Sequence, residues 1–449
     1  MNAYLASVLE NVRTKHGNEP EFVQTVEEVL SSLEPVIEKH PEYEKVDLLN
    51  RMVEPERMFT FRVVWCDDNG QWHTNRGWRC QFNGAIGPYK GGLRFQKNVY
   101  EGIIKFLGFE QTFKNSLTGL PIGGAKGGSD FDPAGKSDAE VMRFCQSFMT
   151  ALYRYIGPDI DVPAGDMGVG GREIGYLFGQ YKRIRNEFNG VLTGKGLSYG
   201  GSLIRPEATG YGAIYYLQEV LKHENDTIEG KKIAISGYGN VGWGIMKKAA
   251  QLGAAVTYFA GPDGYVHDPD GVITDEKLNY ILEMRAKDPM HCKPYADKFG
   301  CEFVAGEKCW GVKDVDVYMP AAMQNDVRME SAEKIAASGV KYYIEVANMP
   351  TTNDALEFLK EQKHMVVAPS KAVNAGGVGV SALEMAQNSE RLVWTAEEVD
   401  AQLHKMMKTI HKESADAAAE YGLGYDLVAG ANIAGFKKVA EAMMEQGCF

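Results

Sequence analysis

The sequence predicts an α/β protein of two domains, a mixed α/β N-terminal domain and a second domain built on a doubly wound parallel sheet. Three observations lead to this prediction. The chain has 449 residues, whereas a typical domain has about 150. Asp68-Asn69-Gly70 is a strong hairpin turn between two strand-like segments. In the second half of the chain, strand-like segments alternate with helix-like ones, as in a parallel sheet covered on both faces.

Composition and charge exclude several classes of protein. The formal net charge of -12 argues against a nucleic-acid partner. No apolar run approaches the ~20 residues that cross a membrane, and the N-terminus has no pattern of a signal peptide. The 7 cysteines form no CxxC pair and do not cluster with histidine, which predicts reduced thiols and no metal site. We therefore expect a cytoplasmic protein that binds neither nucleic acid nor membrane nor metal.

Residues 1–58 are predicted to be helical, because Phe22, Val26, Val29 and Leu30 share one helical face. This N-terminal arm carries no chemistry of its own. We expect it to serve in packing or in contacts between subunits.

Residues 90–130 carry four lysines beside apolar segments, and glycine pairs flank two of them. These are Lys90, Lys105, Lys114 and Lys126. A single lysine on a loop is normally solvated. Several cations against an apolar wall instead suit a small anion with more than one carboxylate or phosphate. Neighbouring lysines also depress one another's pKa, so that one of them could activate water.

Residues 161–181 contain the turn Pro163-Ala164-Gly165-Asp166-Met167-Gly168, between a predicted strand and a predicted helix. An aspartate in such a turn usually caps or closes it. From the local sequence alone, this structural interpretation of Asp166 is favoured over a chemical one.

Gly237-x-Gly239-x-x-Gly242 follows a predicted strand and precedes a predicted helix. In this context the motif indicates a Rossmann-like turn, whose backbone amides face the pyrophosphate of a dinucleotide. The alternative is a glycine-rich turn in an ordinary βαβ unit. Asp263 stands near the end of the next strand without Arg or Lys nearby, and its charge would repel a 2′-phosphate. NAD is therefore favoured as cofactor, with NADP as the alternative.

Three further strands are predicted at 315–319, 342–346 and 365–368. Ligands bind beyond the carboxyl ends of such strands. The polar residues expected there, as candidates for the nicotinamide side, are Gln324, Asn325, Asn348 and Asn374. Residues 374–381 are so rich in glycine that we expect no regular element there, but a hinge or a loop facing a ligand. A dinucleotide domain beside a lysine-lined pocket implies hydride transfer to a small polyanion.

Several long segments resemble the hexameric glutamate dehydrogenases of bacteria, in the Glu/Leu/Phe/Val dehydrogenase family. They are QFNGAIGPYKGGLRF, KFLGFEQTFKNSLTGLPIGGAKGGSDFDP, DVPAGDMGVGGREIGY, GGSLIRPEATGYG, VANMPTT and NAGGVGVSALEMAQN. The resemblance covers nearly the whole chain, and the GPDGY strand end resembles the NAD-using clostridial members. Two segments depart from the family pattern, at 96–101 and at 321–323, where the family carries a threonine before Gln324.

The resemblance implies the reaction and its partners. The expected activity is oxidative deamination of L-glutamate to 2-oxoglutarate and ammonium with hydride transfer to NAD, and the reverse reductive amination. It also implies a substrate-binding and assembly domain at 1–200, a Rossmann-like NAD-binding domain at 201–425 with the cleft between them, and a C-terminal helix at 426–449 that returns to the first domain. Self-association as a homohexamer with 32 symmetry is expected.

The resemblance also implies residue roles. Lys90 and Ser381 would bind the γ-carboxylate of glutamate, and Gln111 and Lys114 the α-carboxylate. Lys126 would activate water, and Asp166 would carry the proton of the amino nitrogen, which replaces the turn-cap interpretation. Gly165 would offer its carbonyl oxygen to the amino group. The expected cofactor-binding residues are Thr209, Gly237, Gly239, Asn240, Val241, Gly242, Asp263, Asn348 and Asn374.

Two alternatives differ in class. Dehydrogenases of apolar amino acids replace the lysine and the serine that bind the γ-carboxylate with apolar residues, whereas this chain keeps Lys90 and Ser381. A non-catalytic NAD-sensing protein on the same scaffold would have no need of Lys126 and Asp166, which this chain also keeps.

Overall fold

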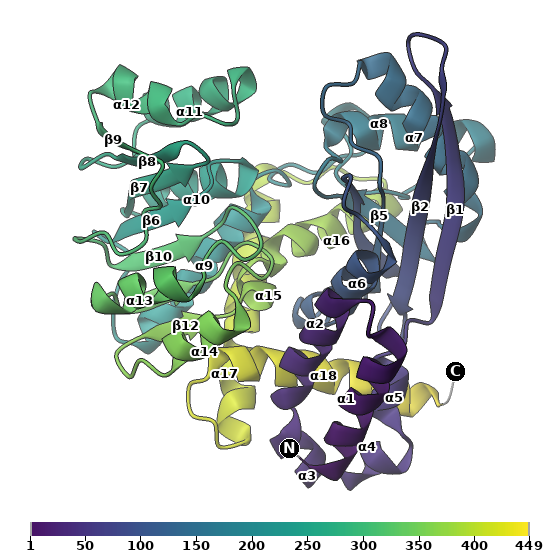
Figure 1. The fold of residues 1–449 in the computed structure, drawn as a ribbon, viewed down its shortest axis with the longest axis horizontal. Helices are drawn as coiled ribbons and strands as arrows, with labels where there is room; N and C mark the ends of the chain where they lie inside the picture. The colour runs from purple at the N-terminus through teal and green to yellow at the C-terminus, as the bar shows by residue number, and fades with distance from the viewer. Residues whose placement is uncertain (1, 448–449) are drawn as a thin grey trace. The chain divides into compact units, whose positions relative to one another are not determined.

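The computed structural model describes residues 2–447, which divide into two compact units (Figure 1). The first unit combines the described chain up to Leu203 with Val378–Val399 and the residues from Asn432 onward. The second unit combines Ile204–Gly377 with Asp400–Ala431. The chain therefore passes between the units more than once.

The first unit opens with a helical arm. Its helices are α1 (Ala3–His16), α2 (Pro20–Ser31), α3 (Glu34–Lys39), α4 (Pro41–Lys45) and α5 (Leu48–Met52). The apolar face expected for the arm is buried, and the Phe22 ring meets that of Phe109 edge to face, with centroids 6.1 Å apart. Aromatic pairs favour this geometry. The arm thus covers part of the core of its own unit.

The sheet of the first unit has 5 strands in the order β1-β2-β4-β3-β5. They are β1 (Arg57–Cys66), β2 (Trp72–Asn83), β3 (Tyr89–Phe95), β4 (Gly123–Ser129) and β5 (Asp161–Gly165). The hairpin predicted at residues 68–70 joins β1 to β2, which pair antiparallel from Arg57↔Gln81 to Cys66↔Trp72. β3 runs parallel to both β4 and β5. The carboxyl ends of these three strands therefore meet at one edge of the sheet.

Helices cover both faces of this sheet. The remaining elements of the unit before Ile204 are α6 (Glu101–Leu117), α7 (Asp138–Leu152), η1 (Tyr153–Tyr155), α8 (Gly171–Arg185) and η2 (Leu197–Tyr199). A capping box opens α7, since the Ser137 hydroxyl accepts from the amide of Glu140 and the Glu140 carboxylate accepts from the amide of Ser137. An aromatic core forms where α7 and α8 pack on the strands, and its Phe131 and Phe144 rings are stacked 3.7 Å apart.

The second unit is a doubly wound sheet of 7 strands in the order β12-β11-β10-β6-β7-β8-β9. Its strands are β6 (Lys232–Ser236), β7 (Ala255–Gly261), β8 (Gly264–His267), β9 (Glu302–Ala305), β10 (Val317–Pro320), β11 (Tyr342–Ile344) and β12 (Val366–Ala368). The predicted fold class is confirmed, because β12, β11, β10, β6 and β7 are parallel. The sequence did not predict the antiparallel extension through β8 and β9.

Helices lie on both faces of the second sheet. They are α9 (Ala208–His223), α10 (Asn240–Gln251), α11 (Asp275–Lys287), α12 (Lys293–Phe299), α13 (Met329–Ala337), α14 (Asn353–Lys360) and α15 (Ser370–Val373). On one face, Phe259 of β7 meets Tyr295 of α12 edge to face. The opposite face carries a core with residues of α13 and α14, including Ile335 and Leu359.

Three long helices each contribute residues to both units. They are α16 (Ala375–Glu390), α17 (Ala396–Glu420) and α18 (Leu427–Gln446). The end of α18 belongs to the first unit, where Ser116 of α6 donates to the carbonyl oxygen of Gly435 over 3.1 Å. No helix among residues 2–447 is long and apolar enough to cross a membrane.

The expectation of an irregular loop at 374–381 is wrong, because α16 begins at Ala375. The glycines serve close packing against α9 instead. A Cβ on Gly376 would lie 2.7 Å from the carbonyl oxygen of Ala208, and one on Gly377 would overlap the hydroxyl of Thr209. Glycine lowers helix propensity by about 1 kcal/mol per residue, but burial against a second helix outweighs this cost.

Candidate functional site

A lysine and an aspartate of the first sheet form an ion pair beside the carboxyl end of β5. Lys126 lies within β4, and Asp166 directly follows β5. Because β4 and β5 both run parallel to β3, these two positions lie close together. Lys126 Nζ lies 2.7 Å from Asp166 Oδ2, and the Lys126 side chain is 5% exposed. The two residues to which the family resemblance assigns the chemistry are therefore in direct contact.

Burial and charge act in opposite directions on this pair. Burial lowers the pKa of Lys126 and outweighs the attraction of Asp166, which raises it. Burial alone would raise the pKa of Asp166, but the positive charges of Lys126 and Arg94 outweigh it and hold this pKa below its usual value. Asp166 is therefore ionised and can act as a base. Lys126 loses its proton more readily than a solvated lysine does, because its pKa is lowered.

Arg94 is a residue that the sequence reasoning missed. Its Nε lies 3.2 Å from Asp166 Oδ2, so the carboxylate is shared between two cations. Arg94 is the sixth residue of β3, on the strand that also carries Lys90. This contact could not be predicted from the sequence pattern of β3, because it depends on β5 being the neighbouring strand. The excess of positive charge suits an anionic substrate.

Lys90 is buried, with 1% exposure, and its Nζ donates to the hydroxyl of Thr193 over 2.8 Å. Its carbonyl oxygen accepts from the Asn115 side chain over 3.0 Å. Beneath this strand, the fully buried guanidinium of Arg79 donates to the carbonyl oxygen of Gly91 over 3.0 Å and pairs with Asp161. Backbone and side chain of Lys90 are thus both held in place.

Glycines let β3 approach its neighbours. A Cβ on Gly92 would lie 2.7 Å from the carbonyl oxygen of Gly165 and 3.0 Å from Cβ of Asp166. A Cβ on Gly91 would overlap the Ala125 carbonyl and lie 3.4 Å from Cγ of Gln111. No larger residue fits at either position. The glycine pair after Lys90 therefore lets β3 lie close to Gly165, Asp166 and the helix that carries Gln111.

The two residues predicted to bind the α-carboxylate lie on α6. Gln111 and Lys114 are both half-buried. Gln111 Nε2 donates to Asn115 Oδ1 over 2.6 Å, which ties it to the residue that holds the Lys90 carbonyl. The structure therefore gathers five predicted positions around β3: Lys90, Gln111, Lys126, Gly165 and Asp166.

Ser381 is buried on α16, one helical turn before Glu384. Glu384 Oε1 lies 2.9 Å from Lys195 Nζ, and both side chains are almost fully buried. The Glu384 carboxylate also accepts from the amide of Gly194 over 2.9 Å. Thr193, the partner of Lys90, directly precedes Gly194. One short segment thus bonds both to Lys90 and to the helix that carries Ser381.

In the second unit, the glycine fingerprint forms the turn from β6 into α10. Gly237 adopts φ +81°, a conformation that favours glycine. A Cβ on Gly242 would overlap the Gly237 carbonyl, whereas one on Gly239 would meet nothing within 4 Å. The backbone at Gly239 is therefore open to close approach by a ligand, at the start of a helix whose amides attract anions. Asn240 and Val241 begin that helix.

The asparagines predicted for the nicotinamide side come together. Asn374 Nδ2 donates to Asn348 Oδ1 over 2.9 Å, and the amide of Asn325 donates to the carbonyl oxygen of Met349 over 2.9 Å. Asn374 is 3% exposed, and its Oδ1 has no hydrogen-bond partner within the described chain. Such a buried acceptor requires a donor, and the carboxamide of a nicotinamide would supply one. The second unit therefore fits a nicotinamide dinucleotide.

Two other predicted cofactor residues have structural contacts. The Asp263 carboxylate accepts from the amide of Cys292 over 2.9 Å and from that of Lys293 over 3.2 Å, so it caps the start of α12. Thr209 packs against Gly377. Gln324 is half-buried and precedes Asn325. These contacts leave the proposed roles of Asp263 and Thr209 toward a cofactor as predictions.

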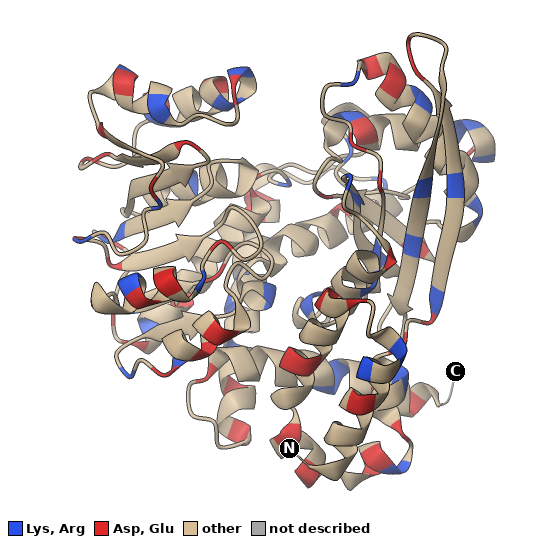
Figure 2. Cartoon of the chain, in the orientation of Figure 1, with Lys and Arg blue, Asp and Glu red and all other residues tan. Residues whose placement is uncertain are grey.

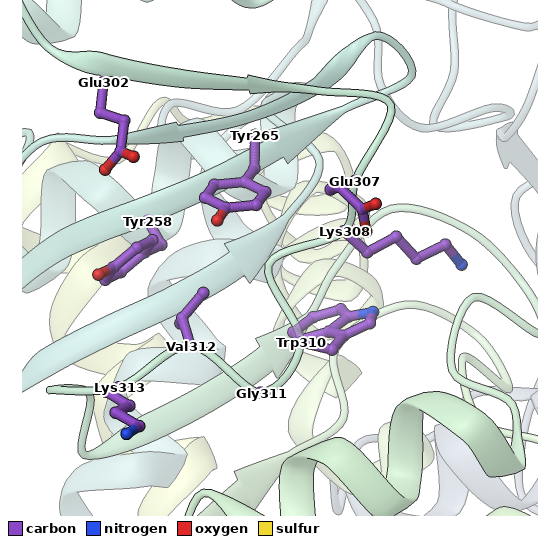
Figure 3. Close-up of a pocket in the computed structure, with 9 residues that line it drawn as sticks. All are labelled: Tyr258, Tyr265, Glu302, Glu307, Lys308, Trp310, Gly311, Val312 and Lys313. Atoms are coloured by element: carbon purple, nitrogen blue, oxygen red, sulfur yellow. The ribbon is translucent and has the colours of Figure 1, made fainter.

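A separate pocket of about 480 Å³ lies on the antiparallel extension of the second sheet (Figure 3). Tyr258, Tyr265 and Trp310 supply its aromatic walls, and Lys308 and Lys313 are among its charged residues. None of the predicted site residues lines it. Across residues 2–447 no group of three or more His, Cys, Asp or Glu side chains could hold a metal ion. Lysines, arginines and carboxylates are interspersed over both units (Figure 2).

A glycine turn on a parallel sheet, with a buried lysine–aspartate pair in the other unit, defines a nucleotide-dependent α/β oxidoreductase. Residues 55–183 match the Glu/Leu/Phe/Val dehydrogenase dimerisation domain, and residues 200–447 match the Glutamate/Leucine/Phenylalanine/Valine dehydrogenase family. The chain therefore belongs to the Glu/Leu/Phe/Val dehydrogenase family, as the sequence predicted.

Relatives of known name align over the full chain. The NAD-specific glutamate dehydrogenase of Clostridium symbiosum is 67% identical over 448 residues, covering 100% of this chain and 99% of that protein. The NADP-specific glutamate dehydrogenase of Haemophilus influenzae is 52% identical, covering 100% of this chain and 99% of that protein. A solved glutamate dehydrogenase structure superposes with a TM-score of 0.99 at 67% identity, and the match covers 100% of both chains.

Proposed function

We propose that this chain is an NAD-dependent glutamate dehydrogenase. It oxidises L-glutamate with NAD and water to 2-oxoglutarate, ammonium, NADH and a proton, and it catalyses the reverse reductive amination. The observation that carries the proposal is the Lys126–Asp166 pair at 2.7 Å, beside the buried cation Lys90. The match to a NAD-specific glutamate dehydrogenase at 67% identity supports the same substrate and cofactor.

Two groups of residues hold the two carboxylates of glutamate in this proposal. Lys90 and Ser381 bind the γ-carboxylate, and Gln111 and Lys114 bind the α-carboxylate. Burial of Lys90 supports its part, because a desolvated ammonium gains strongly from a carboxylate and rejects an apolar side chain. This favours glutamate over the apolar amino acids that other members of the family use.

Asp166 and Lys126 perform the proton transfers. The ionised Asp166 accepts a proton from the amino group of glutamate, and the carbonyl oxygen of Gly165 orients that group. NAD supplies the carbon that accepts the hydride from Cα. Lys126, whose pKa burial lowers, takes a proton from the water that attacks the resulting imine carbon. Asp166 then returns a proton to the nitrogen of the carbinolamine. The C–N bond breaks as the hydroxyl group loses its proton to form the ketone of 2-oxoglutarate, and the departing ammonia takes up that proton to become ammonium.

The cofactor contacts are proposed on the second unit. The open backbone at Gly239 and the start of α10 at Asn240 and Val241 face the pyrophosphate, with Gly237 and Gly242 shaping the turn. Asn374 donates from its Nδ2 to Asn348, and its unpaired Oδ1 would accept a hydrogen bond from the nicotinamide carboxamide. Asp263 disfavours the 2′-phosphate of NADP. NADP is the second candidate, because one relative that is 52% identical to this chain is an NADP-specific glutamate dehydrogenase.

We further propose a cytoplasmic homohexamer. The free cysteines of the described chain fit a reducing compartment. The match of residues 55–183 to a dimerisation domain supports self-association. A solution mass of six times the 49.6 kDa chain would support the hexamer, and a monomer or dimer would contradict it.

The test is the absorbance change at 340 nm with glutamate, run in parallel with NAD and NADP. We expect turnover with NAD, a much lower rate with NADP, and little activity with leucine or valine. Comparable rates with both cofactors would retain the reaction and reject the role of Asp263. No turnover in a folded protein that binds NADH would favour the NAD-sensing alternative.

A further inference from the structure

One guanidinium group in the second unit has no anion beside it. Arg285 lies on α11, seven residues after Leu278, so both lie on nearly the same helical face. That face packs against α10, because Trp243 Nε1 donates to the carbonyl oxygen of Leu278 over 3.1 Å. Arg285 therefore faces α10 from within an apolar stripe, where a cation is not expected.

The contacts of Arg285 place it at the start of α10. Its Nη2 donates to Oδ1 of Asn240, the first residue of that helix, over 2.7 Å. Its Nη1 is buried and has no hydrogen-bond partner within the described chain. No carboxylate among residues 2–447 forms an ion pair with it, and burial alone lowers its pKa. Arg285 thus brings a cation and an unpaired donor beside Asn240, which directly follows Gly239.

This arrangement is unfavourable without an anion. The start of a helix carries a partial positive charge, so it repels a cation. A buried donor without a partner and a half-buried charge without a counter-ion each add a further cost. An anion at the start of α10 would remove all three penalties, and the cofactor expected at this turn carries a pyrophosphate.

We propose that Arg285 binds the pyrophosphate of NAD, together with the backbone amides at the start of α10. The Asn240 side chain holds the guanidinium in position through its Oδ1, and the free Nη1 is the donor to the phosphate oxygens. This inference rests on the proposed use of a nicotinamide dinucleotide and adds a residue that the fingerprint does not contain.

The test compares three variants of the full-length protein. Arg285→Gln removes the charge, and Arg285→Lys keeps the charge but not the planar fork of donors. Lys287→Gln is the matched control, because Lys287 is an exposed cation two residues further along the same helix. The dissociation constants of NADH and NADPH are measured by nucleotide fluorescence at low and high salt, without substrate.

We expect Arg285→Gln to weaken NADH binding about tenfold or more, because it removes a charge-assisted hydrogen bond. The salt dependence of NADH binding should decrease in the same variant. Arg285→Lys should lie between this variant and the wild type, and Lys287→Gln should match the wild type. NADPH binding should weaken by the same factor as NADH binding, since both cofactors carry the pyrophosphate.

Thermal unfolding separates binding from folding. Without cofactor, Arg285→Gln should be at least as stable as the wild type, and saturating NADH should raise its Tm less. A loss of Tm without cofactor together with an unchanged response to NADH would overturn the proposal and make Arg285 structural. If Arg285→Gln weakened NADPH binding but left NADH binding unchanged, the pyrophosphate role would be overturned, and Arg285 would instead contact the 2′-phosphate of NADP. Failure of the wild type to bind either nucleotide would overturn the proposed function as well.

Discussion

The buried pair of Lys195 and Glu384 supports a prediction that links folding to substrate binding. Glu384→Gln would leave the Lys195 ammonium, 1% exposed, without its counter-charge. Breaking a buried ion pair on one side costs about 3–5 kcal/mol. Gly194 and Lys195 donate their amides to different oxygens of Glu384, and glutamine has only one side-chain oxygen, so the variant also loses one of these two bonds. The expected loss of stability therefore combines the unpaired charge of Lys195 with one lost hydrogen bond.

The sign of the pH dependence follows from the same pair. Burial lowers the pKa of Lys195, and the charge of Glu384 opposes this effect. Glu384→Gln removes the opposition, so the pKa of Lys195 in the folded protein falls further below its unfolded value of about 10.4. Between these two pKa values the unfolded chain binds more protons than the folded protein. The stability deficit of the variant should therefore shrink as the pH rises toward 10.

Substrate binding should respond to the same change. Glu384 holds the segment whose Thr193 contacts Lys90, and it lies one turn from Ser381. Displacement of Lys90 and Ser381, the two residues proposed to bind the γ-carboxylate, should raise KM for glutamate about tenfold, since a hydrogen bond to a charged group contributes about 1.5–3 kcal/mol. The dissociation constant of NADH should stay unchanged.

The assay is urea unfolding at fixed protein concentration, combined with initial-rate kinetics. Lys195→Met combined with Glu384→Gln removes both charges and should recover most of the lost stability. Glu390→Gln is the control, because Glu390 is exposed on the same helix and should change stability by less than about 0.5 kcal/mol. A Glu384→Gln protein with wild-type stability and wild-type KM for glutamate would refute the reasoning.

Three further changes test the site and the fold. Asp166→Ser should lower kcat about 100-fold or more and leave NADH binding intact, because only the proton path is cut; a fluorescence titration showing lost NADH affinity would count against this role. Lys90→Leu combined with Ser381→Val should shift kcat/KM from glutamate toward monocarboxylic amino acids, and unchanged selectivity would reject the γ-carboxylate assignment. Burial lowers the pKa of His411 to about 4, so the unfolded chain binds the extra proton between pH 6.5 and 4, and up to about 3 kcal/mol of stability is lost as the pH falls through this window. His411→Gln, which can keep a bond to Tyr425, should flatten the fall of Tm in that range, and an unaltered slope would assign the effect to other groups.

Features coded by a few neighbouring residues could be predicted from the sequence. The hairpin turn at residues 68–70 forms as expected. The glycine fingerprint also lies at the predicted turn, with φ +81° at Gly237. Each of these features depends on backbone conformations and hydrogen bonds within one or two turns of chain, which the residue types themselves restrict. The prediction for 374–381 failed because it used local glycine propensity where packing against α9 prevails.

The site could be predicted in part. The long segments that resemble glutamate dehydrogenases are sufficient to indicate Lys90, Lys126 and Asp166. Arg94 lies in one of those segments but received no role, because its contact with Asp166 depends on the pairing of β3 with β5. Arg285 lies outside all of them, on a helix whose other inward residues are apolar.

Periodicity, turns and contiguous motifs were enough to predict the fold class, the family and the residue types proposed to bind a dicarboxylate and a dinucleotide. Which charged residues come into contact could be seen only in the folded chain. Lys126 and Asp166 are 40 positions apart in the sequence, and Lys195 and Glu384 are 189 apart. Their contacts depend on strand order and on helix packing, since a one-residue change of register would turn a strand's side chains to the opposite face. Strand register cannot be read from the local sequence. The electrostatics of the site could therefore not be predicted, because it depends on these registers.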